Sequence, residues 1–593
     1  MSEPTRAWED AVLDAERRGE LLLAFDLAEQ GLEERPGDLW LKHRAVLALA
    51  RAGSTDEAQR RFEGYGLASV GQEDIQALGA RIAKDVALEA DGRERRALAL
   101  HAAGLYREIF EQSGGYYTGV NAATMLLVGG RRSEAQNIAL RVLAALPSES
   151  DSYYAAASEA EADLVLGRPA DAHRALERAS ALHAGDYGAL STIRRQLRLV
   201  CREADIDSDL LAAIAGPAVV HYCGHRIAPA GGDGRFRADE EPVVADLITA
   251  EVERDRPGFA YGALASGADI LFAEALLAVA AELHVVLPFH RDEFVRCSVE
   301  DGGPEWVVRF ERCIAAATSV KYATDDAYLN DDVLHRYASE LAMGLALLRA
   351  RFLDAEVHQL AVWDGREAES IAGTAVDVAT WTGGHREVRV ISPGAAPRGL
   401  RTPVARPLSR ASSRRVCAML FADVRGYSKL TDEQLPRFST SVFGALGAVL
   451  ERHSEAVRYC NTWGDALYVV LDDAVAAAAC ALDLQDAMEA LDLDALDLPS
   501  HLALRLGAHV GPVFPVEDPI VHSPAFIGSH VSRTARIEPV TPPGAVYVTE
   551  PFAAALILRD SEFGFDYVGH VPAAKDYGRL RMYRLRRRSH WRA

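Results

Sequence analysis

The sequence predicts a multidomain chain: an all-α array of helices, then an α/β domain with a parallel sheet, then a domain that mixes α and β. Its 593 residues are enough for about three to four domains. From Arg6 to about Arg202, alanine and leucine recur at helical spacing. From about Pro217 to Pro393, strand-like runs alternate with helical runs, which is typical of a parallel sheet.

Composition indicates a globular chain, with 49% hydrophobic and 25% charged residues. The net charge of −22 argues against broad binding to nucleic acid or to an anionic membrane. The seven cysteines form no C-x-x-C pair, which favours a reduced, cytoplasmic setting. The charged start of the chain does not resemble a signal peptide. The most apolar window, 271–289, contains charged residues, so we expect a buried helix and strand and not a membrane span.

Residues 1–205 are expected to form stacked helical hairpins separated by short turns such as Arg35-Pro36-Gly37-Asp38. The region resembles tetratricopeptide arrays. Its segment 116–124 resembles part of the TRAFs-binding helical domain of stress-activated kinases. The resemblance implies a regulatory array with a protein partner. The alternative is a purely structural helical domain, because repeats reveal a scaffold and not a ligand.

Residues 216–393 are expected to form the parallel α/β domain. Two short motifs follow strand-like runs, at the positions where such sheets bind ligands. The region resembles the Rossmann-like SLOG domains, which are proposed to sense or process nucleotide-derived ligands. The alternative role for His225 and Arg226 is to hold a loop by hydrogen bonds. The residues of this second ligand site are Gly224, His225, Arg226, Ser266, Gly267 and Asp269.

Residues 394–415 are predicted to be a basic linker, since prolines and six arginines stand among glycine and serine. Docking of these arginines on an acidic neighbouring domain is the alternative. The C-terminal run Arg584 to Trp591 is also basic. Against the negative net charge, we interpret it as a tail or an intramolecular contact.

The segment 416–429 predicts a site for metal and phosphate. Val416 to Ala422 is an apolar run typical of a central strand, and Asp423 places a carboxylate at its end. Gly426 permits a turn whose backbone N–H groups approach a phosphate, before a new helix begins. Taken alone, this pattern is equally typical of an Asp that caps a helix or aids solubility.

Three later segments add groups that suit the same chemistry. Asp465 lies in a turn between two strand-like runs, and two carboxylates can hold two divalent ions. The segment 528–536 predicts a helix on which Ser532 and Arg536, four residues apart, share one face. Lys575 adds a point charge, suited to a terminal phosphate, just before the last strand.

In this order the four segments resemble the catalytic domain of class III nucleotide cyclases, over residues 416–593. The resemblance implies a ferredoxin-like α+β fold and two Mg²⁺ or Mn²⁺ ions, held by Asp423, Asp465 and the backbone carbonyl of Val424. It implies that Arg536 stabilises the transition state, with Ser532 at the position where the family usually has Asn. The phosphates of a nucleoside triphosphate would be bound by Lys575 and by the turn Arg425, Gly426, Tyr427 and Ser428.

The predicted base pocket departs from both common patterns of the family. Asn461 and Ala525 stand where adenylate cyclases have Lys and Asp, and where guanylate cyclases have Glu and a small residue such as Cys. The stretches 461–467 and 532–544 look most like the pyrimidine cyclases of bacterial anti-phage (Pycsar) systems, which make cyclic UMP or cyclic CMP. Tyr459 and Trp463 would narrow the pocket against a purine; packing within a hairpin is the alternative for either aromatic residue.

We therefore expect a cytoplasmic class III cyclase that makes a cyclic pyrimidine nucleotide in signalling or anti-phage defence. Two alternatives remain open: an adenylate or guanylate cyclase with an unusual pocket, and a catalytically silent sensor or scaffold that only binds nucleotide. Class III sites are shared across a dimer, so the resemblance implies a homodimer with a triphosphate substrate. Asp423 and Asp465 would come from one protomer, Ser532 and Arg536 from the other.

Overall fold

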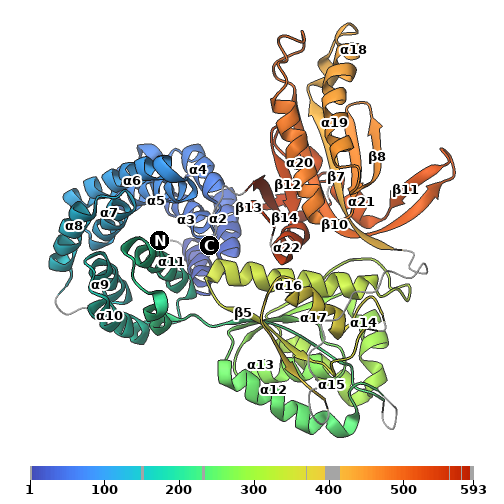
Figure 1. Cartoon of the computed structure of the whole chain (residues 1–593), viewed down its shortest axis with the longest axis horizontal. Coiled ribbons are helices and arrows are strands. Elements are labelled where there is room, and N and C mark those ends of the chain that lie inside the picture. The colour runs from blue at the N-terminus through green and yellow to red at the C-terminus, as the bar shows by residue number, and fades with distance from the viewer. Residues whose placement is uncertain are drawn as a thin grey trace.

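The computed structural model describes residues 3–147, 152–183, 185–229, 234–368, 370–393, 414–559, 561–575 and 577–587. A helical region comes first, a region built on a six-stranded sheet follows, and a region built on an eight-stranded sheet ends the chain (Figure 1). The predicted succession of helical, sheet-containing and mixed regions is confirmed. The predicted linker lies outside the described residues, except for Arg414 and Arg415.

The N-terminal region is an array of antiparallel helices, as predicted. Consecutive helices from α1 to α10 pack on one another. In contrast, α11 contacts α1, α7 and α9, so it lies inside the curve that the others form (Figure 1). Fully buried alanines such as Ala45 and Ala48 let the helices approach closely. The described helices are α1 (Glu3–Arg17), α2 (Leu21–Glu34), α3 (Leu39–Arg51), α4 (Thr55–Gly64), α5 (Glu73–Glu89), α6 (Gly92–Ser113), α7 (Tyr116–Val128), α8 (Arg132–Ala145), α9 (Tyr153–Val165), α10 (Pro169–Leu182) and α11 (Tyr187–Ala204).

The middle region is a parallel sheet in the order β4-β3-β2-β1-β5-β6. The chain winds in one direction from β1 to β4 and then crosses to β5, so the order reverses beside β1, where open α/β sheets bind ligands. The strands are β1 (Val219–Gly224), β2 (Phe259–Gly262), β3 (Glu282–Leu287), β4 (Ser319–Tyr322), β5 (Val357–Val362) and β6 (Val388–Ile391). The helices are α12 (Glu241–Asp255), α13 (Ala268–Ala278), α14 (Arg291–Ser298), α15 (Pro304–Ala316), α16 (Val333–Leu353) and α17 (Thr374–Thr382).

The C-terminal region is built on a mixed sheet in the order β13-β14-β12-β10-β7-β9-β8, with β11 paired to β10. Its strands are β7 (Arg415–Arg425), β8 (Val457–Trp463), β9 (Ala466–Leu471), β10 (Ala503–Asp518), β11 (Ser523–Ile527), β12 (Val546–Thr549), β13 (Phe563–Pro572) and β14 (Arg579–Arg587). Its helices are α18 (Gln434–Phe438), α19 (Gly444–Arg452), α20 (Ala474–Glu489), α21 (Ser529–Thr534) and α22 (Glu550–Leu558).

The central strand β7 explains how this sheet places its side chains. Residues of a strand alternate between the two faces of a sheet. Leu420 belongs to the core that includes α20, whereas Met419 lies on the opposite face, within 3.9 Å of Thr534 on α21. Asp423 is four residues after Met419 on the same strand, so its side chain points to the same face of the sheet. That is the face covered by α21, and Asp423 lies there at the end of β7.

The middle and C-terminal regions meet along α16 and α22. A Cβ atom on Gly344 would lie 2.4 Å from the Ala554 carbonyl oxygen, so a side chain there would push the two helices apart. Arg414 is buried and donates to Asp331 at 3.0 Å, so this arginine of the predicted linker docks on an acidic neighbour. Of the two interpretations of the C-terminal run, the intramolecular contact holds for Arg584 to Arg587, which form the end of β14; residues 588–593 lie outside the described part.

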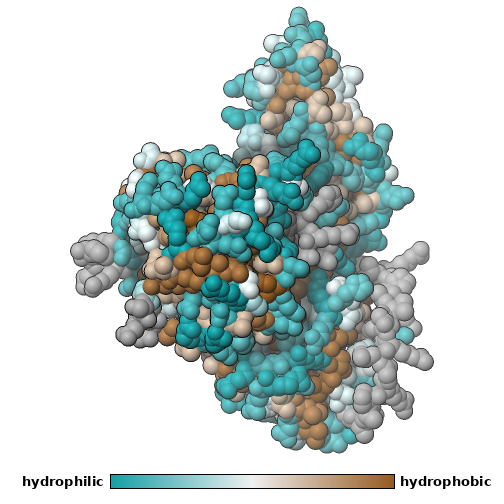
Figure 2. All heavy atoms as spheres, turned by 60° about the vertical axis from the view of Figure 1, so that its left-hand side comes forward, coloured by the Kyte–Doolittle hydropathy of each residue, from teal (hydrophilic) through white to brown (hydrophobic). Residues whose placement is uncertain are grey.

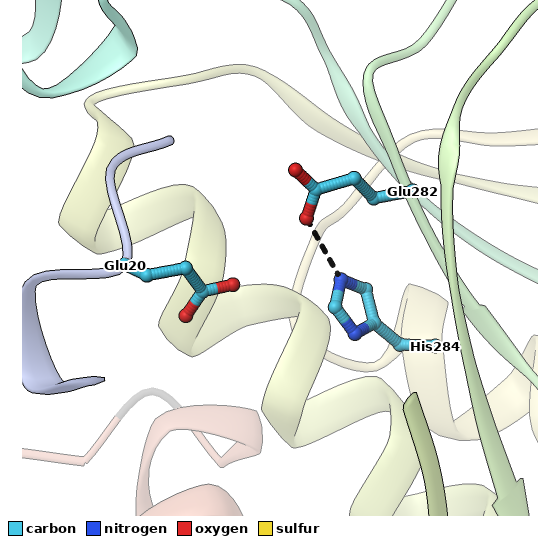
Figure 3. Close-up of side chains that lie close together, drawn as sticks. All are labelled: Glu20, Glu282 and His284. Atoms are coloured by element: carbon cyan, nitrogen blue, oxygen red, sulfur yellow. Dashed lines mark ion pairs between the residues drawn. The ribbon is translucent and has the colours of Figure 1, made fainter. Parts of the chain in front are cut away.

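The helical array joins the middle region through an ionic group. Glu20, at the start of α2, faces Glu282 and His284 on β3 (Figure 3). The three side chains could supply ligands to a metal ion, but Arg349 already lies 3.0 Å from Glu20 and 3.8 Å from Glu282. The guanidinium supplies the positive charge that offsets these two half-buried carboxylates. We therefore interpret the group as a contact between regions.

The predicted buried helix and strand in the window 271–289 correspond to α13 and β3. Across the described ranges of the chain, none of the helices is both long enough and apolar enough to span a membrane.

Candidate active site

Two carboxylates meet at one end of the C-terminal sheet. Asp465 lies in the turn between β8 and β9, and Asp423 on β7 is in register with Ala466, the residue that follows. Burial, and then the neighbouring Asp423 carboxylate, raise the pKa of Asp465. The sheet register therefore brings the predicted pair together within one chain.

Two further charged residues, Arg505 and Glu538, join this pair and were not predicted. Arg505 lies opposite Asp423 on β10 and donates to its Oδ2, from Nη2 at 2.7 Å and from Nε at 3.1 Å. It is also paired with Glu538, just beyond α21. Burial raises the pKa of Glu538 to about 7, with Arg505 opposing the shift and Asp423 adding to it. The sequence did contain a signal for Arg505, because this charged residue stands between two apolar residues, Leu504 and Leu506, in a strand.

This donor set fits divalent metal ions. Three carboxylates face a single guanidinium, so the cluster of Asp423, Asp465, Glu538 and Arg505 carries excess negative charge. Carboxylate oxygens are the donors that Mg²⁺ and Mn²⁺ prefer. The Val424 side chain packs in the core on the other face, so only its backbone carbonyl is available to such an ion.

The turn after β7 lies next to the carboxylates. Gly426 has a φ of +97°, and a Cβ there would lie 3.1 Å from the His501 ring. Tyr427 packs on Phe438 and is the nearest side chain to Gly464 in the β8–β9 turn. The predicted order of a glycine turn and then a new helix is confirmed: a short 3-10 turn, Tyr427–Lys429, follows the glycine, and α18 starts at Gln434. Arg425 and Ser428 are exposed.

The second predicted group lies on and after α21. The helix ends at Thr534, so Arg536 lies beyond it and not on it, which corrects the prediction. Its backbone continues the turn, because the Arg536 N–H donates to the Arg533 carbonyl at 3.0 Å. Ser532 is exposed. Within the described residues the half-buried Arg536 guanidinium has no hydrogen-bond or ion-pair partner.

Lys575 lies next to this helix end. It occupies the turn between β13 and β14 with a φ of +58°, and its side chain is exposed. The preceding Ala574 N–H donates to the Arg536 carbonyl at 3.1 Å. The fold thus brings the turn that carries Lys575 to the Arg536 backbone, although the two residues are 39 apart in the sequence (575 minus 536).

The opposite side of α21 is anchored to the middle region. His530 is fully buried, lies 2.7 Å from His509, and reaches Thr324 of the middle region at 3.1 Å. Ser529 donates to Asp326 at 2.7 Å, and Arg533 pairs with Asp325 at 3.2 Å. His530 and Arg533 are therefore engaged elsewhere, and neither replaces the missing Asn at position 532. This contact fixes α21, the helix that carries Ser532 and that precedes Arg536.

The predicted base-pocket residues lie on two neighbouring strands. Asn461 is on β8 and Ala525 on β11, and the two strands contact each other. Tyr459 packs edge-on against Tyr468 and Phe526, with ring centroids 5.5 and 6.2 Å away. The hairpin-packing alternative for Tyr459 is therefore the observed arrangement.

The second predicted ligand site lies in the middle region, at the carboxyl ends of β1 and β2. Gly267 has a φ of +106°, and a Cβ there would lie 2.4 Å from the Ile227 nitrogen, so two loops touch at this glycine. His225 lies 3.1 Å from Asp364, and Arg226 donates to Asp301 at 2.8 Å. Both contacts hold a loop in place, which is the alternative role expected for these two residues. The structure brings all six predicted residues together: Gly224, His225, Arg226, Ser266, Gly267 and Asp269.

Two family models match the chain. Residues 410–587 match the model described as "Adenylate and Guanylate cyclase catalytic domain". Residues 20–126 match the model described as "Tetratricopeptide Repeats-Sensor". The C-terminal region is therefore a class III cyclase catalytic domain, and the N-terminal region contains tetratricopeptide-like repeats.

Similar proteins include a Rhizobium meliloti (strain 1021) protein named "Putative adenylate cyclase 3", 32% identical over 139 residues. The match covers 23% of this chain and 22% of that protein, so the chain spans less than a quarter of its relative. Among solved structures, the P. aeruginosa adenylyl cyclase CyaB is 17% identical, with a TM-score of 0.27, over 29% of this chain and 94% of that one. The Catenaria anguillulae guanylate cyclase domain of RhGC in complex with GTP is 17% identical, with a TM-score of 0.26, over 30% of this chain and 100% of that one.

Proposed function

We propose that this chain is a class III nucleotide cyclase that converts a nucleoside triphosphate to a 3′,5′-cyclic nucleotide and pyrophosphate. The observation that carries the proposal is the meeting of Asp423 and Asp465 at the end of the central strand, inside a domain of the cyclase family. Two carboxylates in contact require a cation, and two divalent ions suit phosphoryl chemistry.

In this proposal Asp423, Asp465 and the Val424 carbonyl hold two Mg²⁺ or Mn²⁺ ions. Bound ions would lower the pKa of the ribose 3′-hydroxyl and neutralise charge on the phosphates. The protein positions its own carboxylates for this: Arg505 fixes the orientation of Asp423 by two hydrogen bonds to one oxygen. The second oxygen of Asp423 is left for other ligands.

The remaining groups bind the phosphates. The turn from Arg425 to Ser428 would donate N–H groups to the β- and γ-phosphates, and Lys575 would contact the terminal phosphate. Arg536 would stabilise charge on the α-phosphate as it is attacked, and Ser532 would donate one hydrogen bond there. Because the Arg536 guanidinium has no partner among the described residues, it is free to bind an anionic phosphate group.

We propose a homodimer in which each active site uses both copies. Two exposed hydrophobic features of the C-terminal domain support a partner surface. The β10–β11 hairpin extends from the body of the molecule (Figure 1), and it exposes 85% of Ile520 and 65% of Val521. Trp463, beside Asp465, is 55% exposed. Large exposed apolar side chains are often part of protein contacts, and a second copy would cover these.

For the base, we propose a pyrimidine, so the product would be cyclic UMP or cyclic CMP, in signalling or anti-phage defence. The support is that Asn461 and Ala525 match neither the adenylate nor the guanylate pattern. An adenylate or guanylate cyclase is the second candidate, favoured by the relatives' names.

A comparison of four nucleoside triphosphates as substrates distinguishes these candidate functions. Purified protein with Mn²⁺ is incubated with ATP, GTP, CTP or UTP, and the products are identified by mass. We expect UTP or CTP to be converted at least about tenfold faster than either purine, which is the discrimination that about 1.4 kcal/mol provides. A preference for ATP would remove the pyrimidine proposal and leave the cyclase proposal intact. No cyclic product from any of the four would favour the silent sensor.

We also propose that the middle domain is a Rossmann-like, SLOG-like domain that binds a nucleotide-derived ligand beside Gly224 and Gly267. A cavity of about 270 Å³ reaches Gly224, Arg226 and Asp269 and also the start of α17. Burial raises the pKa of Asp269 to about 7, as expected for a carboxyl that faces an enclosed space.

A further inference from the structure

A large cavity lies where all three regions meet. Its volume is about 860 Å³, and it is lined by α5 and α11 of the array, the end of α16, and Gly564 and Arg586 of the C-terminal domain. Eight Lys and Arg side chains line it, against four carboxylates. The outer face of the array that is turned to the viewer in Figure 2 is mostly hydrophilic, with one short hydrophobic stripe. The eight cationic side chains of the cavity therefore lie between the three regions.

Lys84 is the first sign that the cavity contains cations to which no described carboxylate is bonded. The side chain is 6% exposed. Among the described residues it donates to neutral amides, Asn121 Oδ1 at 2.9 Å and Gln196 Oε1 at 3.1 Å. Burial and then the nearby Arg81 lower the pKa of Lys84 to about 8. A buried ammonium without a bonded carboxylate destabilises the protein unless an anion reaches it.

Arg195 is the second sign. Its guanidinium donates to three backbone carbonyls: Arg51 on the array at 2.8 Å, and Arg351 and Phe352 at the end of α16 at 2.6 and 2.7 Å. Among the described residues, neither Lys84 nor Arg195 forms an ion pair. Three of the four lining carboxylates are already paired with other lining arginines: Asp85 with Arg81, Asp354 with Arg194, and Glu89 with Arg586.

We infer that this cavity binds a phosphate-bearing small molecule of about nucleotide size. Phosphate oxygens accept several charge-assisted hydrogen bonds at once, which clustered Arg and Lys side chains provide. The volume lies within the range of small-molecule sites. Apolar side chains in the lining give a ring system a surface to pack on; they are Leu88, Leu199, Leu347 and Val357.

The position of the cavity links such a ligand to the candidate active site. The ligand would contact the array, α16 and the C-terminal domain together. The same α16 packs along α22 through Gly344, and Tyr337 near its start donates to the Val510 carbonyl on β10. A ligand that fixes the end of α16 therefore biases how the middle region holds the catalytic domain.

The test uses inorganic pyrophosphate as the probe and the melting temperature of the full chain as the readout. All proteins carry Asp465→Asn and are measured in EDTA, so that metal-dependent binding at the candidate active site does not contribute. We expect millimolar pyrophosphate to raise the melting temperature, with Lys84→Met weakening the apparent affinity at least tenfold. Without probe, Lys84→Met should melt at the same temperature or higher, because a buried unpaired charge has been removed.

Two further variants complete the design. Arg96→Met removes an exposed cation of α6 outside the cavity and should leave the pyrophosphate effect unchanged. Arg198→Gln removes a lining cation whose side chain is 48% exposed, so its folding is not at risk, and should weaken the effect severalfold. Absence of any pyrophosphate effect, or equal effects in the starting protein, Lys84→Met and Arg198→Gln, would overturn the inference. If Lys84→Met fails to fold, Arg198→Gln decides alone.

Discussion

Replacing Asp465 with Asn is expected to lower turnover by about three orders of magnitude, because the change removes a carboxylate that two-metal chemistry requires. The fold should be unaffected. Asp465 lies in a hairpin turn and not in the core, and burial and then the nearby Asp423 carboxylate raise its pKa. Removing one of two repelling charges should leave the melting temperature unchanged or slightly higher. Steady-state kinetics and a thermal melt of the same preparation give both values.

Asp472→Asn is the matched control for this variant. Asp472 follows β9 and forms an exposed ion pair with Arg458, with 45% of each side chain accessible. It carries the same charge on the same hairpin, away from Asp423, so its loss should leave turnover within about twofold, as expected for an exposed pair. Near wild-type turnover in Asp465→Asn would contradict the metal assignment.

Arg536→Ala is expected to lower kcat at least about a hundredfold, the usual cost of removing one donor to a developing charge. KM should change less, since the contact forms mainly in the transition state. The melting temperature should stay the same, because among the described residues the guanidinium has no partner to lose. Full kinetic curves with the preferred nucleotide separate the two constants.

Arg533→Ala is the comparison for this variant. Arg533 pairs with Asp325 of the middle domain and contacts Tyr577, so its loss should loosen α21 and lower the melting temperature, with a smaller fall in kcat. If the two variants lost kcat equally and both melted early, Arg536 would be a structural residue and not a catalytic one.

The sequence predicted the parts of this site that depend on local pattern. Asp423 at the end of an apolar strand and Asp465 in a hairpin turn could be found because strand ends and turns follow from composition. Arg505 and Glu538 could not be found in this way. Their place beside Asp423 depends on the register of β10 against β7 and on the path of the chain after α21.

Long-range packing also explains the wrong predictions. The helix after Gly528 ends two residues before Arg536, where its backbone meets the turn that carries Lys575. For Arg586 the choice between a tail and an intramolecular contact also depends on packing: it lies in a strand, and Asp566 on β13 and Glu89 of the array neutralise it. The docking of His530 on the middle domain joins residues more than two hundred positions apart (530 minus 324 is 206), which periodicity does not reveal.

The measurement that tests the shared two-copy site most directly is the activity of a mixture of two inactive proteins. Asp423→Ala lacks the carboxylate group, and Arg536→Ala lacks the transition-state cation. If each site takes carboxylates from one copy and Arg536 from the other, a mixed dimer contains one intact site and one doubly damaged site.

At equal mixing about half of the dimers are mixed, so the account predicts recovery of up to roughly a quarter of wild-type activity when subunits exchange freely. Exchange is shown independently by energy transfer between labelled copies. Mixtures of either variant with itself stay inactive. Exchange without any recovery of activity would contradict the shared site and would place the whole catalytic centre, if there is one, within a single copy.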